Sequence, residues 1–402
     1  MRVAAQAGEQ LAIEGGKPVR ATLLPYGRHQ VTPEDIEAVV EVLRSDWLTT
    51  GPKVEEFERA LADYVGAAHA VSFSSGTAAL HGACFAAGIG GGDEAITTPL
   101  TFCATANALL YQGATPIFAD VCEDTLNIDP SEIEKNLTPR TRAVLPVDYA
   151  GHPADLAPIL DLAAKYRLTV IEDASHALGA RYKQRRVGNV SHMSVFSFHP
   201  VKHISTGEGG MVTTQDEDLA RKLKTFRNHG ITSDARSRQQ QGRWQYEMVA
   251  LGCNYRLSDI GAALGISQLE RIEGNLARRR EIAGQYDTAF GGMDELTRPV
   301  TRDEVEHAWH LYPVRLRLDQ LRADRAEILR ALRAENIGAN VHYLPVYQHP
   351  YYRERFPNTP PCPIAEAAYE SLLTLPMFPA MSDSDVSDVI AAVRKVVNHY
   401  RR

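Results

Sequence analysis

Between Ala68 and Thr214, short β-branched runs alternate with stretches of helical periodicity. This alternation is typical of a parallel sheet whose strands are connected by helices. The strands are predicted by AVSFSS, EAITTP, TPIFADV, AVLPVDY, TVIED, MSVFSF and GGMVTT, and the helices between them by segments such as GTAALHGACFAAGI and ADLAPILDLAAKYRL. The pattern therefore predicts an α/β domain built on a large, mostly parallel sheet.

The rest of the chain predicts smaller units around this domain. Its 402 residues are too many for one small core. A helical pattern follows the sheet region, and WHLYPVRLRL, RAEILRALRAENI and ANVHYL then predict a strand, a helix and a strand. We expect an N-terminal segment over 1–50, the large domain over 51–257, a connecting helix over 258–290 and a small C-terminal α+β domain over 291–402.

Charge and apolar content argue against several classes of function. A formal net charge of -7 gives no basic surface for nucleic acid or for an anionic membrane. The first twenty residues lack the apolar core of a secretory signal, and no apolar run is long enough to cross a bilayer. The five cysteines include no CxxC pair and fit reduced thiols. We expect a cytoplasmic protein with no nucleic acid partner, no membrane association and no metal site.

The strongest candidate for chemistry is Lys202, in the segment SVFSFHPVKHISTGEGGMVT. A lysine buried at the end of a strand is costly unless it is paired or chemically used. Taken alone, a lysine in such a loop is more often a surface residue, so the neighbouring motifs decide its interpretation. A lysine that is held neutral can form a Schiff base with the aldehyde of pyridoxal 5′-phosphate (PLP).

PLP also requires a carboxylate against its pyridine nitrogen, amide groups for its phosphate and an aromatic face for its ring. Asp173 ends the strand TVIED, at the edge of the sheet where α/β proteins bind their ligands. The candidates for binding the phosphate and the ring are Ser75, Gly76, Thr77, Phe102 and Ser197. Each of these residues, like Asp173, alone also fits a helix cap, a loop or a core position. Together they fill every role that PLP requires.

Six motifs resemble the DegT family of PLP-dependent sugar aminotransferases over nearly the whole chain. They are SSGTAALH, TTPLTFCATANAL, VIEDASHALGA, FSFHPVKHISTGEGGM, GCNYRLSDIGAALG and HAWHLYPVRL. The resemblance implies the type I, aspartate-aminotransferase-like fold of PLP-dependent transferases, with seven strands in its large sheet. It also implies that Lys202 is the Schiff-base lysine and that Asp173 is the partner of the ring nitrogen.

The same resemblance implies roles for further residues around the cofactor. His176 would lie beside the ring hydroxyl, although a histidine after a strand end is often a satisfied core residue. Phe102 would stack on the ring. The phosphate would be held by Gly76, Thr77 and Ser197, while Asn254 would reach the phosphate bound to the neighbouring subunit of a homodimer with shared active sites.

Two longer segments resemble the aminotransferases of pseudaminic acid biosynthesis. They are PYGRHQVTPEDIEAVVEVLRSDWLTTGPKVEEFE and VHYLPVYQHPYYRERF, and HPVKHISTGEGG is the form usual in relatives that aminate C-4 of the sugar. The resemblance implies L-glutamate as the amino donor and a UDP-linked 2-acetamido-2,6-dideoxy-4-hexulose as the acceptor, with GDP- and dTDP-linked 4-keto-6-deoxysugars as alternatives. Thr50, His342 and Tyr343 are the expected substrate contacts, and loop and domain packing explains them equally well.

Three other functions are consistent with parts of the sequence. A nicotinamide oxidoreductase needs GxGxxG after its first strand, whereas GIGGGDE precedes a strand here. In the sugar dehydratases of the family a histidine replaces the lysine, and that reading would require His203 to take the place of Lys202. A non-enzymatic regulator of the same fold would be expected to have a degraded site. The complete set of candidate residues favours the aminotransferase.

Overall fold

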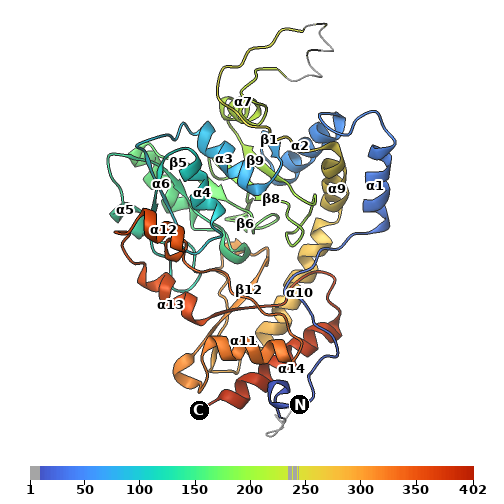
Figure 1. The fold of residues 1–402 in the computed structure, drawn as a ribbon, viewed down its shortest axis with the longest axis vertical. Helices are drawn as coiled ribbons and strands as arrows, with labels where there is room; N and C mark the ends of the chain where they lie inside the picture. The colour runs from blue at the N-terminus through green and yellow to red at the C-terminus, as the bar shows by residue number, and fades with distance from the viewer. Residues whose placement is uncertain (1–9, 234–237, 239–241, 243) are drawn as a thin grey trace.

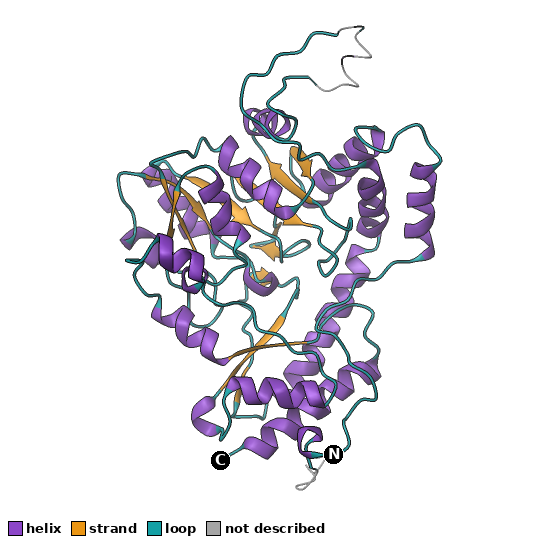
Figure 2. Cartoon of the chain, in the orientation of Figure 1, coloured by secondary structure: helices purple, strands orange, loops and turns teal. Residues whose placement is uncertain are grey.

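The computed structural model describes residues 10–402 apart from 234–237, 239–241 and 243. A seven-stranded sheet lies at the centre of the larger half of the molecule (Figures 1 and 2). All neighbouring strands run parallel except β9, which is antiparallel to both β1 and β8. In spatial order the strands are β1 (His69–Phe73), β9 (Gly210–Thr214), β8 (Met193–Ser197), β5 (Thr169–Asp173), β4 (Thr141–Leu145), β2 (Glu94–Thr97) and β3 (Thr115–Phe118). The predicted α/β class, the mostly parallel sheet and its seven strands are confirmed.

Both faces of this sheet are covered by helices. Side chains alternate between the two faces along each strand, so Ala143 and Leu145 belong to one core and Val144 to another. The first core includes residues of α3 (Gly76–Ala86), α4 (Ala104–Tyr111) and α7 (Glu217–Phe226). The opposite side is packed by α2 (Pro52–Val65), α5 (Pro130–Lys135), α6 (Leu156–Tyr166) and α9 (Asp259–Glu270). α1 (Pro33–Leu43) packs outside α9, and a short turn η2 (Tyr149–Gly151) follows β4.

The smaller half is built on a three-stranded antiparallel sheet of β10 (Leu296–Thr297), β12 (Tyr312–Leu316) and β13 (Leu372–Leu375). Its core also buries Leu11 and Leu24 from near the N-terminus. Glu335 fixes that N-terminal stretch, because its carboxylate accepts the amides of Ala12 and Val19, each at 2.9 Å. The remaining elements are η1 (Ala12–Glu14), α10 (Ile272–Phe290), β11 (Val305–Glu306), η3 (Leu318–Gln320), α11 (Arg325–Ala334), η4 (Val346–Gln348), α12 (Pro350–Arg355), α13 (Pro363–Ser371) and α14 (Asp383–Tyr400).

Two predicted elements differ from the structure. The single helix predicted over 258–290 is two helices, α9 and α10, separated at Arg271, whose guanidinium bonds the buried carboxylate of Asp35 at 2.5 Å. The strand predicted for ANVHYL is an extended segment with one bridge, Asn340 to Thr374. Side chains bond to part of the remaining backbone; for example, the Tyr149 hydroxyl donates to the carbonyl of His342 at 2.5 Å. These side-chain bonds replace the ladder that a second strand would supply.

A third, small sheet joins the two halves. β11 pairs with β6 (Arg181–Tyr182), which pairs with β7 (Arg185–Arg186). The segment after β11 enters the larger half, where the amide of Ala308 donates to the carbonyl of Gly151 at 2.9 Å. Within the described residues, no helix combines the length and the apolar composition needed to cross a membrane.

Candidate active site

Lys202 lies in the turn that follows β8, at the carboxyl edge of the large sheet. Its amide donates to the carbonyl of His199 at 2.9 Å, and its Nζ lies 3.5 Å from Nε2 of His310. Burial lowers the pKa of Lys202 to about 8, Asp173 opposes this shift, and the positive charge of Arg279 adds to it. At neutral pH the neutral amine is therefore far more populated than in a solvated lysine, as a nucleophilic or basic lysine requires.

Asp173 ends β5 at the same edge and is 5% exposed. Its Oδ2 accepts the Thr105 hydroxyl at 2.7 Å, and its Oδ1 accepts the amide of Ser175 at 3.2 Å. Thr105 belongs to the first turn of α4 and is fully buried. The carboxylate is thus held in a fixed orientation and can still accept a further donor.

His176 and Tyr343 form a polar pair beside Lys202. The Tyr343 hydroxyl lies 3.1 Å from Nε2 of His176, and the His176 ring packs against His310 with centroids 4.3 Å apart. Burial, followed by the charge of Lys202, lowers the pKa of His176 well below its usual value. The imidazole is therefore neutral, and its buried Nδ1 has no protein partner. The sequence analysis predicts that His176 lies beside the ring hydroxyl of the cofactor, which is a polar partner that such an unpaired nitrogen lacks in the protein.

His342 and Phe102 complete the described surroundings of this group. Nδ1 of His342 lies 3.0 Å from the Thr374 hydroxyl, and burial, followed by Lys202, lowers the pKa of His342 to about 4. Phe102 is 60% exposed, and its ring centroid lies 6.4 Å from that of Tyr343. A large exposed ring at this edge offers a flat face to a planar ligand. Two of the three predicted substrate residues, His342 and Tyr343, therefore lie at the site.

The predicted phosphate residues meet at the N-terminus of α3. Ser75 caps this helix by accepting the amide of Ala78 at 3.1 Å, and Gly76 is its first residue. A Cβ on Gly76 would lie 2.9 Å from Cβ of Ser197, which ends β8. The unpaired amides of the first helical turn, at Gly76 and Thr77, thus lie beside the hydroxyl-bearing Ser197. Helix N-termini of this kind bind phosphate.

Thr50 and Asn254 lie elsewhere in the chain. Thr50 lines a cavity of about 630 Å³ together with Asn228 and Arg256. Asn254 is exposed and forms a bridge with Asn228. In the part of the chain that the structure describes, no hydrogen bond, ion pair or ring contact joins either residue to the Lys202 group. A role for Asn254 in a neighbouring subunit stays a prediction.

The sequence prediction missed three residues of this site: Thr105, Arg279 and His310. Arg279 is 1% exposed and lies on α10. Its guanidinium donates to the carbonyls of Trp309 (3.0 Å), His310 (3.2 Å) and Met377 (3.2 Å). The motif HAWHLYPVRL contains His310, but nothing in that stretch of sequence indicates which of its histidines faces the lysine.

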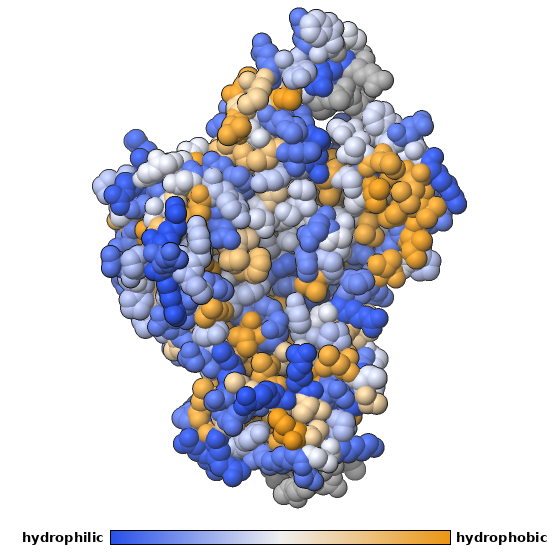
Figure 3. Space-filling model, viewed as in Figure 1, coloured by the Kyte–Doolittle hydropathy of each residue, from blue (hydrophilic) through white to orange (hydrophobic). Residues whose placement is uncertain are grey.

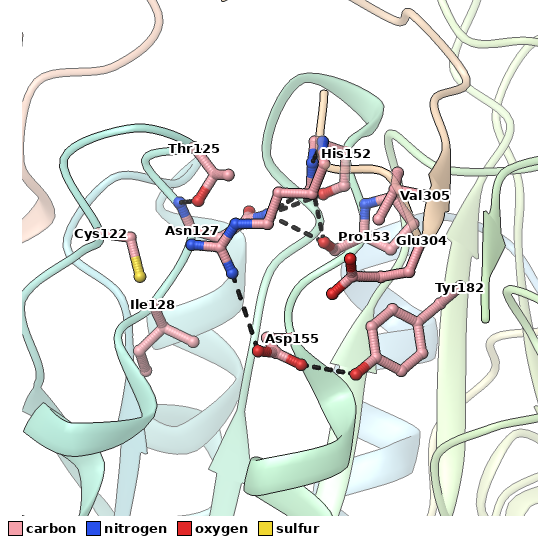
Figure 4. Close-up of a pocket in the computed structure, with 11 residues that line it drawn as sticks. Cys122, Thr125, Asn127, Ile128, His152, Pro153, Asp155, Tyr182, Glu304 and Val305 are labelled. Atoms are coloured by element: carbon pink, nitrogen blue, oxygen red, sulfur yellow. Dashed lines mark hydrogen bonds and ion pairs between the residues drawn. The ribbon is translucent and has the colours of Figure 1, made fainter. Parts of the chain in front are cut away.

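A separate cavity lies between the segments 122–128, 152–155 and 302–305 and Tyr182 of β6, and Figure 4 shows its lining. Asp155 accepts the Tyr182 hydroxyl at 2.5 Å and pairs with Arg302 at 3.7 Å. The cavity volume is only about 10 Å³, which is at most enough for one water molecule. We therefore assign it to packing between the two halves of the molecule.

The Lys202 group fits PLP. Asp173 has a free acceptor for a protonated ring nitrogen, Phe102 offers an exposed ring, and Gly76 leaves the space that a phosphate at a helix N-terminus requires. The unpaired Nδ1 atoms of His176 and His310 are buried polar atoms that lack a partner in the protein. When bound, PLP would therefore be held by Lys202, Asp173, His176, Phe102, Gly76, Thr77 and Ser197.

The chain is similar to known proteins over nearly its whole length. The chain is 46% identical over 381 residues to the spore coat polysaccharide biosynthesis protein SpsC of Bacillus subtilis, covering 94% of this chain and 98% of that protein. Its fold matches Helicobacter pylori PseC, an aminotransferase involved in the biosynthesis of pseudoaminic acid, with TM-score 0.88, 36% identity and coverage of 94% and 100%.

A third relative is the putative sugar aminotransferase Spr1654 of Streptococcus pneumoniae, whose PLP form matches with TM-score 0.87, 30% identity and coverage of 94% and 99%. That protein has also been solved in its PMP form. The predicted aspartate-aminotransferase-like fold and the predicted PLP cofactor are confirmed by these relatives. Residues 29–394 match the DegT/DnrJ/EryC1/StrS aminotransferase family. This chain is a member of that family of PLP-dependent sugar aminotransferases.

Proposed function

We propose that this enzyme transfers an amino group from L-glutamate to the C-4 keto carbon of a nucleotide-linked 6-deoxy-4-ketosugar. The acceptor that we favour is a UDP-linked 2-acetamido-2,6-dideoxy-4-hexulose, as in pseudaminic acid biosynthesis. The observation that carries the transaminase chemistry is the arrangement of Lys202, with its lowered pKa, beside Asp173 and His176. The likeness to PseC over 94% of the chain supports the sugar assignment.

Each residue of the site has a distinct part in this proposal. PLP, when bound, supplies an electron sink for the negative charge that develops at the α-carbon of the amino donor. Lys202 is the general base and acid: its neutral amine takes the proton from one carbon and returns it to another within its reach. Asp173 keeps a proton on the ring nitrogen of the cofactor. His176 is neutral, so it forms a hydrogen bond to the cofactor without adding charge to the site.

The contact made by His203 argues against the dehydratase alternative. Its Nε2 donates to the carbonyl of Ala308 at 3.0 Å, and the ring is 4% exposed. Lys202, one residue earlier, is the residue near His310 and Asp173. A histidine that bonds a backbone carbonyl in this way supports the fold, whereas Lys202 lies beside the other residues of the proposed site.

We also propose that the active unit is a homodimer. Figure 3 shows an apolar area over α1. The exposed apolar residues of α1 and of the chain on either side of it are Val31, Ile36, Leu43, Trp47 and Leu48, each at least 37% exposed. Exposed apolar areas of this kind are typical of protein interfaces. A second exposed apolar group, Trp244 to Leu251, directly precedes Asn254. These surfaces would bring Asn254, and with it Thr50, to the active site of the second subunit.

The dimer is tested by sedimentation velocity at assay concentration. Leu43→Glu places a charge on the apolar area and should shift the protein towards a monomer with lower activity. The control is Val300→Glu, which changes an exposed apolar residue on the smaller half and should leave the dimer intact. An active wild-type monomer would contradict the proposal.

A cytoplasmic location is also proposed, and all five cysteines are free, as reduced thiols would be.

The sugar assignment is tested by a panel of acceptors. The purified enzyme is incubated with L-glutamate and UDP-, GDP- or dTDP-linked 4-keto-6-deoxysugars, and NMR locates the new amine. We expect the highest kcat/KM with the UDP-linked 2-acetamido sugar and amination at C-4. A preference for the GDP- or dTDP-linked sugar would change the nucleotide assignment, whereas amination at C-3 would contradict the proposed position. Loss of all turnover in Lys202→Ala is the control for the chemistry.

A further inference from the structure

The ring of His310 is the protein group that lies against the amine of Lys202. The distance from Nε2 to Nζ is 3.5 Å, at the long limit of a hydrogen bond. Such contacts often tighten only when the ligands of an active site are bound. No other protein atom in the described part of the chain forms a hydrogen bond with this amine.

We propose that His310 is a positioning residue for Lys202: its Nε2 accepts a hydrogen bond from the amine and stabilises the lysine while it carries a proton. This inference rests on the proposed role of Lys202 as base and acid. A protonated amine is only a donor, so Nε2 of His310 must present its lone pair. The ring proton then lies on Nδ1, which is buried and has no partner in the protein.

The ring of His310 is held in this position from several sides. Its carbonyl accepts the Arg279 guanidinium at 3.2 Å, so α10 anchors the backbone. The His176 ring packs against it, with centroids 4.3 Å apart and planes at 37°, and the centroid of His203 lies 5.7 Å away. A ring restrained in this way keeps its acceptor directed at the amine after the lysine is released from the cofactor.

The surroundings keep His310 neutral, as an acceptor must be. Burial lowers the pKa of His310 well below its usual value, and nearby positive groups lower it further. The residue is 5% exposed. Lys202 keeps its proton in preference to His310, because its own pKa is about 8. The titratable and charged groups facing this pair are Asp173, His176, His203, Arg279 and His342.

The test is the pH dependence of cofactor loading, because the neutral amine of Lys202 is the form that reacts. The full-length apoprotein is mixed with PLP in a stopped-flow instrument, and the visible absorbance of the bound cofactor gives the rate. For the wild type we expect the rate to rise with pH through an inflection near 8. In His310→Phe the lost acceptor should lower this inflection by about one to two units.

Two variants separate the hydrogen bond from mere packing. His310→Gln keeps an acceptor oxygen and should retain the inflection of the wild type. His307→Phe replaces another buried histidine of the same segment, whose ring stacks on Trp309 with centroids 3.9 Å apart. We expect its inflection to be unchanged. His310→Met is a second apolar replacement, and circular dichroism establishes that each variant is folded.

The outcomes distinguish this inference from the proposed function. Normal loading and absorbance in Lys202→Ala would contradict the role of the lysine itself. If Lys202→Ala fails to load but His310→Phe and His310→Met keep the wild-type inflection, the role of His310 is refuted. An equal shift in His307→Phe would also refute it, because burial and not the hydrogen bond would then be the cause.

Discussion

The contact between Gly76 and Ser197 gives the sharpest test of the phosphate site. In Gly76→Ala the new Cβ would lie 2.9 Å from Cβ and 3.0 Å from Oγ of Ser197, well inside normal contact. Overpacking of this kind costs about 1–3 kcal/mol. Alanine returns up to about 1 kcal/mol through its higher helix propensity. The net expectation is a loss of about 1–2 kcal/mol.

That loss should appear in cofactor affinity, because the first turn of α3 must move away from Ser197. Each 1.4 kcal/mol corresponds to about a tenfold change in Kd. The assay is titration of the apoprotein with PLP, followed by visible absorbance. We expect Gly76→Ala to bind about tenfold more weakly than the wild type.

A double-mutant cycle isolates the steric cause. Ser197→Gly removes both of the closest atoms and leaves only a 3.4 Å contact to the Cα of residue 197, so the penalty of Gly76→Ala should largely disappear in that background. Ser197→Ala retains the Cβ at 2.9 Å, so the penalty should persist there. Wild-type affinity in Gly76→Ala, or equal penalties in the glycine and alanine backgrounds, would refute the argument.

Three further predictions concern the polar contacts of the site. Thr105→Val removes the 2.7 Å hydrogen bond to Asp173 and should destabilise the apoprotein in urea by about 1.5–3 kcal/mol, whereas Thr105→Ser should retain most of the stability. Tyr343→Phe leaves Nε2 of His176 without its partner at 3.1 Å and should weaken PLP binding, which titration would detect. The native state keeps His342 neutral down to about pH 4, while the unfolded chain binds a proton below about pH 6.5, so stability must fall as pH drops through this window. His342→Gln should therefore reduce that fall, measured by urea denaturation, by up to about 1.4 kcal/mol per pH unit, and an unchanged slope would contradict the burial of a neutral imidazole.

The sheet could be predicted from the sequence because its strands are short apolar runs buried on both faces. Val170 and Ile171 are typical: both are fully buried, and they belong to different cores. The resemblance of the motifs then predicted roles for Lys202, Asp173 and His176, and the structure brings these three residues to one edge of that sheet. Strand ends of a parallel sheet meet at one edge, so residues distant in sequence become neighbours.

Contacts between distant segments could not be predicted in this way. ANVHYL has the alternation of a strand, but its polar groups bond to side chains such as Tyr149 and Thr374. Arg279 lies in an ordinary helical pattern, and only the fold reveals that three backbone carbonyls surround it. Local patterns specify which face of an element is buried, whereas the partner of a buried polar group depends on the packing of the whole chain.

The central claim is that Lys202 is the residue that binds the cofactor covalently. Reduction of the PLP-loaded enzyme with sodium borohydride fixes the cofactor to the amine that holds it, and peptide mass spectrometry then identifies the labelled lysine. We predict pyridoxyl phosphate on the peptide that contains Lys202 and on no other peptide. A label on a different lysine, such as Lys183 or Lys224, or an active enzyme that acquires no label, would contradict the account.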